Sequence, residues 1–456
     1  MHANHEPQAP KRTTRTILVW AGVALAAGLI AAWLALRPWA AADMKDAPFV
    51  GPAPSSSHSS ASASALAPPG PVTAATRPTG FETCGLPDPA ATVDTTAEAS
   101  REAALDRLAA AELVESLEHA TSDKDRAVGL LLRISSDTMQ GFLAEQLAAQ
   151  DACGGEPTCT SLVMGDPRES IRRYAGPATQ ALAGMATSSS DPFVYATAFG
   201  ACARFAVGDA SAAACQMLSA AQWTRIDPNN SVPWLYEASQ SAERGDLATL
   251  AEAMNRVAQA RSSQDYRDEA EAIAEAAVRE GPGEASATML VIGASAAWPL
   301  PSYQVASKYC SGPSLEDSNR RQICDSIAHR FADQGSNFME QRIGIRMGER
   351  VGWPPEQVAA MRLRSDIEML GYARGATSGT INDCQGLARL RAYRIRQASL
   401  GGEVAAARAW IAASGKSMAE LASELATEKA AEREANETKA AAASTSATNR
   451  ARRSGS

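Results

Sequence analysis

The chain has 456 residues, enough for two ordinary domains or one extended array of repeats. Hydrophobic residues make up 45% of it but aromatic residues only 5%, and alanine dominates, which favours closely packed helices over a sheet. The net charge of −8 argues against nucleic acid as the main partner, because phosphate binding needs a concentrated basic surface.

An uncharged apolar segment lies close to the amino terminus. Residues 17–36 carry no charged side chain, and a helix of that length spans about 30 Å, the thickness of a bilayer core. Three basic residues precede the segment, whereas the basic residues after it are fewer and lie beside acidic ones. The positive-inside rule therefore predicts that residues 1–15 stay in the cytoplasm, that residues 16–36 anchor the chain, and that the remainder is exported.

A cleaved signal peptide is the alternative interpretation of this segment. Ala40, Ala41 and Ala42 resemble a cleavage site, but the apolar run is longer than the core of a signal peptide, and Arg37-Pro38 interrupts it. We therefore favour an uncleaved anchor, and both interpretations export the bulk of the chain. The alanine-rich composition and the anchor followed by a stalk indicate a bacterial protein with a single pass through the inner membrane and its bulk in the periplasm.

The composition divides the exported part into three regions. Residues 37–83 are rich in Ser, Ala and Pro without periodicity, which predicts a flexible linker that holds the folded part about 30 Å from the membrane. Residues 84–416 contain successive helix-length segments and form the predicted helical domain. Residues 417–456 are poor in large apolar side chains, so we expect a polar helix there with a disordered end at 444–456.

Helical segments are predicted from the start of this domain onward. The first three cover residues 95–119, 122–149 and 167–186. The third begins with a capping Asp166 followed by Pro167, which suits the first helical turn. Residues 287–295, ATMLVIGAS, have the composition of a buried strand, but they stand among helices, so we predict a buried helix.

Two pairs of turn signals recur with a period in the thirties. Asp191-Pro192 and Asp227-Pro228 lie 36 residues apart, and the Gly-Asp pairs at 208–209 and 245–246 lie 37 residues apart. Helix-length segments lie between these signals, at 194–207, 210–224, 232–244 and 247–260. Two helices per unit of this length are typical of an α-solenoid, in which stacked helical hairpins share a continuous core.

The second of these units resembles a tetratricopeptide repeat. With Ser231 as its first position, Trp234 falls at the fourth and Ala238 at the eighth, where that family favours a large and a small residue. Residues 227–230 fall at the turn between repeats, and Gly245-Asp246 falls at the turn between the two helices. The resemblance covers residues 190–260 and implies a concave surface that binds a peptide or a protein.

Agreement with the repeat pattern is incomplete. In the preceding unit, Ala213, Met217 and Ala220 match the small, large and small positions of the second helix. Glu237 and Ser241, however, stand where the family has apolar residues. A helical-hairpin domain outside this family accounts for the same turn signals, and both interpretations predict an all-α fold.

All eight cysteines follow the apolar segment, and an even number in an exported chain predicts disulfide bonds. Cys202 and Cys215 lie six residues on either side of Gly208-Asp209, so an antiparallel helix pair would bring them opposite each other. Two other pairs flank short turns, and the last two cysteines would join the start of the folded region to its end. The predicted bonds are Cys153–Cys159, Cys202–Cys215, Cys310–Cys324 and Cys84–Cys384.

Few residues are available for catalysis or metal binding. Only two histidines lie in the predicted folded region, His119 and His329, and His329 follows Asp325 by four residues, on one face of a helix. No nucleophile, metalloprotease or nucleotide-binding motif is present, and the cysteines lack the spacing of a zinc site. We therefore predict no catalysis, no cofactor and no metal, while a pair of carboxylates like that of a muramidase stays open.

These features predict a membrane-tethered, exported helical-repeat protein that binds another protein or a peptide and catalyses no reaction. The candidate binding residues lie around the second repeat unit, on faces that we expect to be exposed: Asn229, Asn230, Tyr236, Gln240 and Arg244. An envelope enzyme, such as a cell-wall hydrolase built on a helical domain, is one alternative. A purely structural spacer is the other.

Overall fold

The computed structural model describes residues 96–154, 159, 163, 167–205, 209–281, 283–296, 298–376 and 384–454. All of them belong to one compact unit, Pro54–Ser456. The predicted cytoplasmic tail, the apolar segment 16–36, the linker 37–83 and Cys84 lie outside the described residues. Within the described ranges, no helix is long and apolar enough to cross a membrane.

Every regular element in the described ranges is a helix, so the predicted all-α class is confirmed. The first elements are α2 (Thr96–Glu118), α3 (Asp123–Ala152), α5 (Pro167–Ser188), α6 (Pro192–Phe205), α7 (Asp209–Gln216), α8 (Ala220–Ile226), α9 (Ser231–Arg244), α10 (Leu247–Gln259) and α11 (Arg267–Ala277). The others are α12 (Glu284–Ala296), α13 (Tyr303–Tyr309), the 3-10 helix η1 (Gly312–Glu316), α14 (Ser318–Gln334), α15 (Phe338–Val351), α16 (Pro355–Ala376), α17 (Cys384–Leu400), α18 (Glu403–Ser414) and α19 (Met418–Ser454). Residues 287–295 lie inside α12, so they are helical as predicted.

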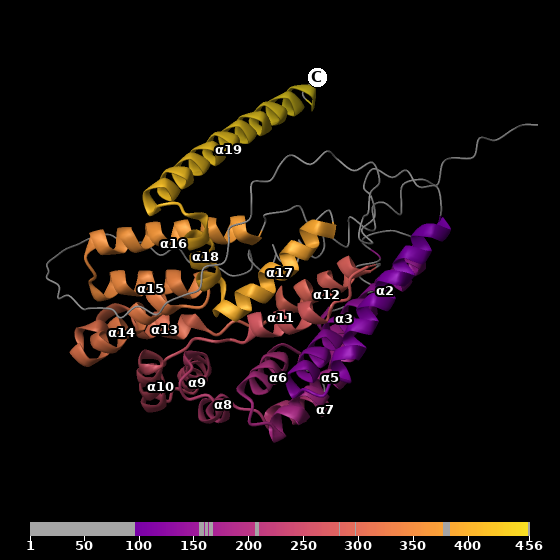
Figure 1. The fold of residues 1–456 in the computed structure, drawn as a ribbon, viewed down its shortest axis with the longest axis horizontal. Helices are drawn as coiled ribbons and strands as arrows, with labels where there is room; N and C mark the ends of the chain where they lie inside the picture. The colour runs from indigo at the N-terminus through magenta and orange to yellow at the C-terminus, as the bar shows by residue number, and fades with distance from the viewer. Residues whose placement is uncertain are drawn as a thin grey trace, which may run out of the picture. The chain divides into compact units, whose positions relative to one another are not determined.

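One core cluster forms where α2, α3, α5 and α6 pack against one another (Figure 1). Its fully buried large side chains include Leu132, Phe193 and Tyr195. Gly129 allows α3 to approach α2 closely, because a Cβ atom at this position would lie 2.6 Å from the backbone nitrogen of Glu118. Helices α11 and α12 contact α2 and α3 as well, so this cluster joins elements far apart in the sequence.

A second core cluster joins α9 and α10 to α13, α14 and α15. Its fully buried side chains include Leu235, Met254, Phe331 and Met347. Figure 1 shows α14, α15 and α16 as successive layers, each helix packing on the next. Gly344 permits the contact between α14 and α15, because a Cβ atom there would clash with the backbone of α14.

The second repeat unit forms the helical hairpin that the sequence predicts. Asn230 caps α9 by accepting from the N–H of Val232, and Asp246 caps α10 by accepting from the N–H of Thr249. Between the two helices, Gly245 has a left-handed backbone conformation with φ of 72°, which favours glycine. Ala238 is fully buried where α9 and α10 meet, as a small residue at this position should be.

The first repeat unit departs from the prediction. Residues 210–224 do not form one helix, because α7 ends at Gln216 and Ser219 caps a separate helix, α8, by accepting from the N–H of Gln222. Met217 lies in the turn between them and is 66% exposed, so it does not fill the large position of a second repeat helix. The hydroxyl of Tyr195 holds this turn through hydrogen bonds with the backbone of Ser219. The predicted regular repeat is therefore interrupted here.

Three of the predicted disulfides are confirmed. They are Cys153–Cys159, Cys202–Cys215 and Cys310–Cys324. Cys384 is also disulfide-bonded, and its predicted partner Cys84 lies outside the described residues.

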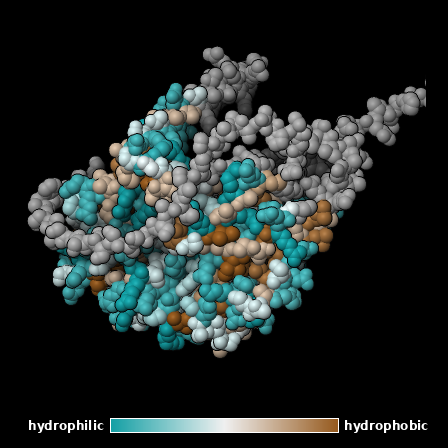
Figure 2. Space-filling view, viewed as in Figure 1, coloured by the Kyte–Doolittle hydropathy of each residue, from teal (hydrophilic) through white to brown (hydrophobic). Residues whose placement is uncertain are grey.

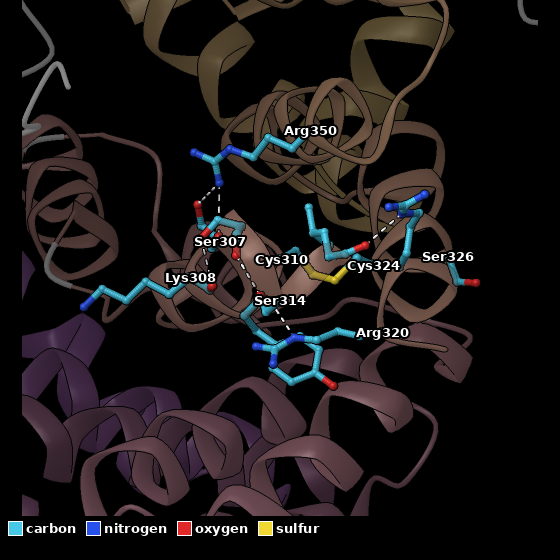
Figure 3. Close-up of a disulfide and its surroundings, with 12 residues drawn as sticks. Ser307, Lys308, Cys310, Ser314, Arg320, Cys324, Ser326 and Arg350 are labelled. Atoms are coloured by element: carbon cyan, nitrogen blue, oxygen red, sulfur yellow. Dashed lines mark hydrogen bonds between the residues drawn. A yellow bond between two sulfur atoms is a disulfide. The ribbon is translucent and has the colours of Figure 1, made fainter. Parts of the chain in front are cut away.

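Figure 3 shows how basic side chains surround the buried bond between Cys310 and Cys324. Arg320 donates to the carbonyl of Tyr309, and Arg350 donates to the hydroxyl of Ser307. Because Arg320 comes from α14 and Arg350 from α15, both helices hold α13 and the disulfide in place.

Helix α19 begins beside α16 and then leads away from the other helices (Figure 1). Leu421 and Leu425 pack on Ile367 and Leu370 of α16, and Glu424 pairs with Arg374. The helix continues to Ser454, so it includes residues 444–454, where the sequence predicted disorder. The segment contains neither proline nor glycine before Gly455, so no residue in it breaks the helix that begins at Met418.

Candidate functional site

The five predicted binding residues do not form one exposed surface. Asn230 is 0% exposed, and its side-chain amide donates to Asp227 and to the carbonyl of Gln264. The prediction that Asn230 lies on an exposed face is wrong, because its side chain is used in the turn that begins α9. Asn229 is exposed, and its carbonyl accepts from the backbone of Arg261 and Ser262.

Tyr236 was also expected on an exposed face, and its side chain instead packs inside the protein. Its ring packs on Phe199 and Trp223, with centroids 5.1 and 5.6 Å away, and its hydroxyl donates to the carbonyl of Pro299 over 3.3 Å. Burial raises the pKa of the Tyr236 hydroxyl well above its usual range. Tyr236 therefore contributes to the core rather than to an accessible surface.

A segment of the same chain covers the part of α9 that contains Tyr236. Trp298 and Pro299 line the same small cavity as Tyr236, with a volume of about 10 Å³. Pro299 also fits against α6 at Gly200, where a Cβ atom would lie 3.0 Å from the proline ring. Of the predicted residues nearby, Arg244 is exposed and interacts with its own helix, where it pairs with Glu237 at 3.4 Å, and Gln240 is half-buried. A peptide-sized hollow is not formed at this hairpin.

The two histidines of the described region have structural contacts. The Nδ1 atom of His119 lies 2.8 Å from the carbonyl of Glu115, one turn earlier in α2. His329 and Asp325 lie on one face of α14, as predicted, with the imidazole Nε2 3.8 Å from the carboxylate of Asp325. The Nδ1 atom of the same ring lies 3.6 Å from the carboxylate of Asp333. The His329 ring packs against Trp353, with the ring centroids 4.3 Å apart and the planes tilted by 36°.

Two glutamates are held in unusual environments. Burial raises the pKa of Glu340 to about 7 and that of Glu275 to about 7. Ser263 and the backbone of Ser336 donate to Glu340, while Arg394 interacts with Glu275. Both residues are 0% exposed. Glu275 links α11 to Arg394 of α17, and Glu340 links α15 to the segments that contain Ser263 and Ser336, so both carboxylates hold parts of the chain together.

A groove of about 650 Å³ lies between α15, α16 and α19. Its floor is apolar and comes from all three helices: Ile345, Met369, Leu370, Ala373 and Leu425. Its edges are polar and mostly charged: Arg342, Arg346, Arg362, Ser365, Asp366, Glu428, Lys429 and Glu432. Helix α16 contacts both other helices, so α15 and α19 form the two opposite edges of the groove.

Ion pairs neutralise most of these edge charges. Asp366 pairs with Arg342 at 2.7 Å and with Lys429 at 2.6 Å, which links α16 to both neighbours. Arg346 and Arg362 both pair with Glu349 at 2.7 Å. Within the floor, Ile345, Leu370 and Leu425 are already buried, so the apolar surface that a ligand could still remove from water is that of Met369 and Ala373.

The local sequence does not predict this groove. Its walls come from residues near 342, 369 and 428, and nothing in the local sequence shows that these helices meet. The available signal was the pair Leu421 and Leu425, one helical turn apart in a tail that is otherwise polar. These two side chains attach α19 to α16 and thereby form the third wall.

Three further cavities lined by described residues are much smaller than this groove, at about 10 Å³ each. On the face shown in Figure 2, the described surface is largely hydrophilic or intermediate, and hydrophobic residues gather near α11 and α12. Met289 of α12 is an exposed large apolar side chain, but it lines none of the cavities described above. Exposed single apolar residues of this kind are common on soluble surfaces.

Among the residues that the structure describes, no group of His, Cys, Asp and Glu side chains could hold a metal ion. Comparison with known proteins gives no relative: no family model, no curated protein and no solved structure matches the chain.

Proposed function

We propose that the protein is an exported, membrane-tethered helical scaffold that binds another protein through the groove between α15, α16 and α19, and that it has no catalytic activity. The observation that carries this proposal is the groove itself. Its volume of about 650 Å³ lies within the range of about 300–1,000 Å³ in which ligand sites usually fall.

The floor of the groove supports binding by burial of apolar surface. Met369 is 37% exposed although its helix, α16, packs against both α15 and α19. A partner side chain that covers Met369 would remove its apolar surface from water, which stabilises the complex by about 25 cal/mol for each Å² buried. A pre-formed groove between helices also needs little reordering when its ligand arrives.

The edge charges support a binding role rather than hydrolysis. A cell-wall hydrolase uses two carboxyl groups that converge on its substrate, one of them free to donate a proton. In the groove, Asp366 pairs with Arg342 and Lys429, and Glu428 pairs with Arg374. These two carboxylates are engaged with basic groups, which leaves Glu432 without a second free carboxyl group beside it in the lining, and we propose no catalytic role for them.

The tethered location follows from the amino-terminal sequence. The uncharged segment 17–36 with basic residues before it would anchor the chain in the inner membrane, and the linker 37–83 would give the helical unit reach. A reporter that is active only in the periplasm, fused after residue 83, should be active. Activity of a cytoplasm-only reporter at the same position would contradict the proposed orientation.

Binding at the groove is tested by Met369→Glu, which places a charge on the apolar floor. The matched control is Leu363→Glu, because Leu363 is on the same helix, is 47% exposed and lies outside the groove lining. In-situ crosslinking of the full chain in native membranes, followed by mass spectrometry, should lose its main partner with Met369→Glu and keep it with Leu363→Glu. Identical crosslinked partners in both variants would refute the groove as the binding site.

A further inference from the structure

We infer that the ligand of this groove is an amphipathic α-helix presented by the partner protein, an inference that rests on the proposed function and specifies its ligand. Proteins recognise peptide segments in a small number of ways, each of which requires particular features of the receiving surface. The features of this groove fit one of them.

Addition of an extended strand requires a free sheet edge, which the groove does not have. Its three walls are helices, and the described ranges contain no strand. The backbone groups of helical walls are already hydrogen-bonded to each other. An extended peptide on the apolar floor would leave its own N–H and C=O groups without partners, whereas a helix satisfies these groups internally.

A proline-rich segment requires side chains that the groove lacks. Such a segment binds to grooves lined by aromatic residues, and no aromatic side chain lines this groove.

The distribution of charge matches the surface of an amphipathic helix. On one edge, Arg342 and Arg346 lie one turn apart on α15. On the other edge, α19 contributes Glu428, Lys429 and Glu432, so its lining residues carry a net negative charge. A helix can present an apolar stripe to the floor with acidic residues along one side and basic residues along the other. An extended chain cannot, because its successive side chains point to opposite faces.

The ligand that this geometry selects has three properties. Its apolar residues recur at i, i+3 or i+4, and i+7, so that they reach the exposed part of the floor at Met369 and Ala373. Acidic side chains lie toward α15 and basic side chains toward Glu432. The existing ion pairs at the rim are exposed and exchange partners readily, so they do not prevent these contacts.

The test uses fluorescein-labelled synthetic peptides of about 18 residues, a length at which an alanine-rich helix forms measurably. The matched peptide has Leu at the anchor positions, Glu along one side and Lys along the other. The first comparison peptide replaces a central alanine by proline, and two others carry only Glu or only Lys on both sides. Fluorescence anisotropy measures their binding to the purified full chain in detergent.

The matched peptide should bind, the proline-containing peptide should lose at least about tenfold in affinity because its helix is broken, and each single-charge peptide should bind several-fold more weakly. Met369→Glu should abolish binding, and Leu363→Glu should leave it unchanged. Glu432→Lys changes an exposed side chain and should shift the preference toward the all-Glu peptide. Equal affinity for the matched and proline-containing peptides would overturn the inference.

Failure of this inference can be told apart from failure of the proposed function. A photo-crosslinking amino acid at position 369, in the full chain in its native membrane, reports whether any partner occupies the groove. A crosslinked partner without binding of the matched peptide would leave the scaffold function standing and refute the helical ligand. Absence of any crosslinked partner, together with absence of peptide binding, would refute both.

Discussion

Trp353 donates a 2.6 Å hydrogen bond from its indole nitrogen to the carboxylate of Asp325 and so fastens the second residue after α15 to α14. The imidazole of His329 packs against the same indole. Asp325 and Asp333 lie one helical turn before and after His329, and Arg364 of α16 also pairs with Asp333 at 3.0 Å. The protonation of one histidine is therefore coupled to the packing of three helices.

His329→Gln should lower the free energy of unfolding more at pH 5.5 than at pH 8.5. The carboxylate of Asp333 raises the pKa of His329 above its ordinary value of 6.5, so the folded chain binds this proton more tightly than the unfolded chain does. The resulting stabilisation is complete below about pH 6.5 and is lost as the pH rises through the raised value. Because the imidazole is half-exposed, the difference should stay below about 1 kcal/mol. Urea unfolding at both pH values measures it, and equal losses would contradict the coupling.

Glu340 should make the stability of the chain fall as the pH rises. Burial raises the pKa of this carboxyl from 4.5 to about 7, even though Ser263 and the backbone of Ser336 donate hydrogen bonds to it. The folded state therefore holds a proton that the unfolded state releases above pH 4.5. This contribution to stability is complete below about pH 4.5 and is lost as the pH rises through 7.

The variant Glu340→Gln removes this titration. From pH 4.5 to pH 8.5, the unfolding free energy of the natural chain should fall by roughly 2–3 kcal/mol relative to that of the variant. Glu356→Gln is the control, because it makes the same chemical change at a side chain that is exposed on α16. A difference for Glu340→Gln that does not vary with pH would show that the carboxyl titrates normally in the folded chain.

Local signals in the sequence were sufficient for the helices and for one hairpin. Asn230, Gly245 and Asp246 act through hydrogen bonds and backbone angles within a few residues, so their type and spacing specify α9 and α10 directly. The same is true of Cys202 and Cys215, whose equal distance from a turn predicted their bond. The break between α7 and α8 was missed because it depends on Tyr195, which reaches Ser219 from another helix.

Tertiary contacts explain why the candidate site was misplaced. Tyr236 has the spacing of a surface position in a repeat, but the chain returns at Pro299, more than sixty residues later, and covers it. The groove between α15 and α19 was missed for the same reason, because tertiary packing that no short segment encodes brings Met369 and Leu425 together. Periodicity identifies which face of a helix is apolar, but it does not identify which element covers that face.

Gly129→Ala should destabilise the chain by about 1–3 kcal/mol, because the added Cβ atom would lie 2.6 Å from the backbone nitrogen of Glu118 and force α2 and α3 apart. Gly293→Ala is the matched control, since Gly293 also lies inside a helix but has no atom within 4 Å of its added Cβ. The control should raise the unfolding free energy by up to about 1 kcal/mol through helix propensity. The two changes in unfolding free energy, measured by urea unfolding, should therefore have opposite signs. Equal destabilisation of both variants would contradict the close approach of α2 and α3.

Asn230→Ala should cost about 2 kcal/mol of stability, whereas Asn229→Ala should change it by less than about 0.5 kcal/mol. The side chain of Asn230 accepts from the N–H groups of Val232 and Gln264 and donates to Asp227, so its loss removes the cap of α9 and leaves buried groups unpaired. Asn229, one residue earlier, holds the turn through its backbone carbonyl, which alanine retains. Thermal unfolding of the two variants measures the contrast. Equal melting temperatures would show that Asn230 is not structural, and its role as a binding residue would then have to be reconsidered.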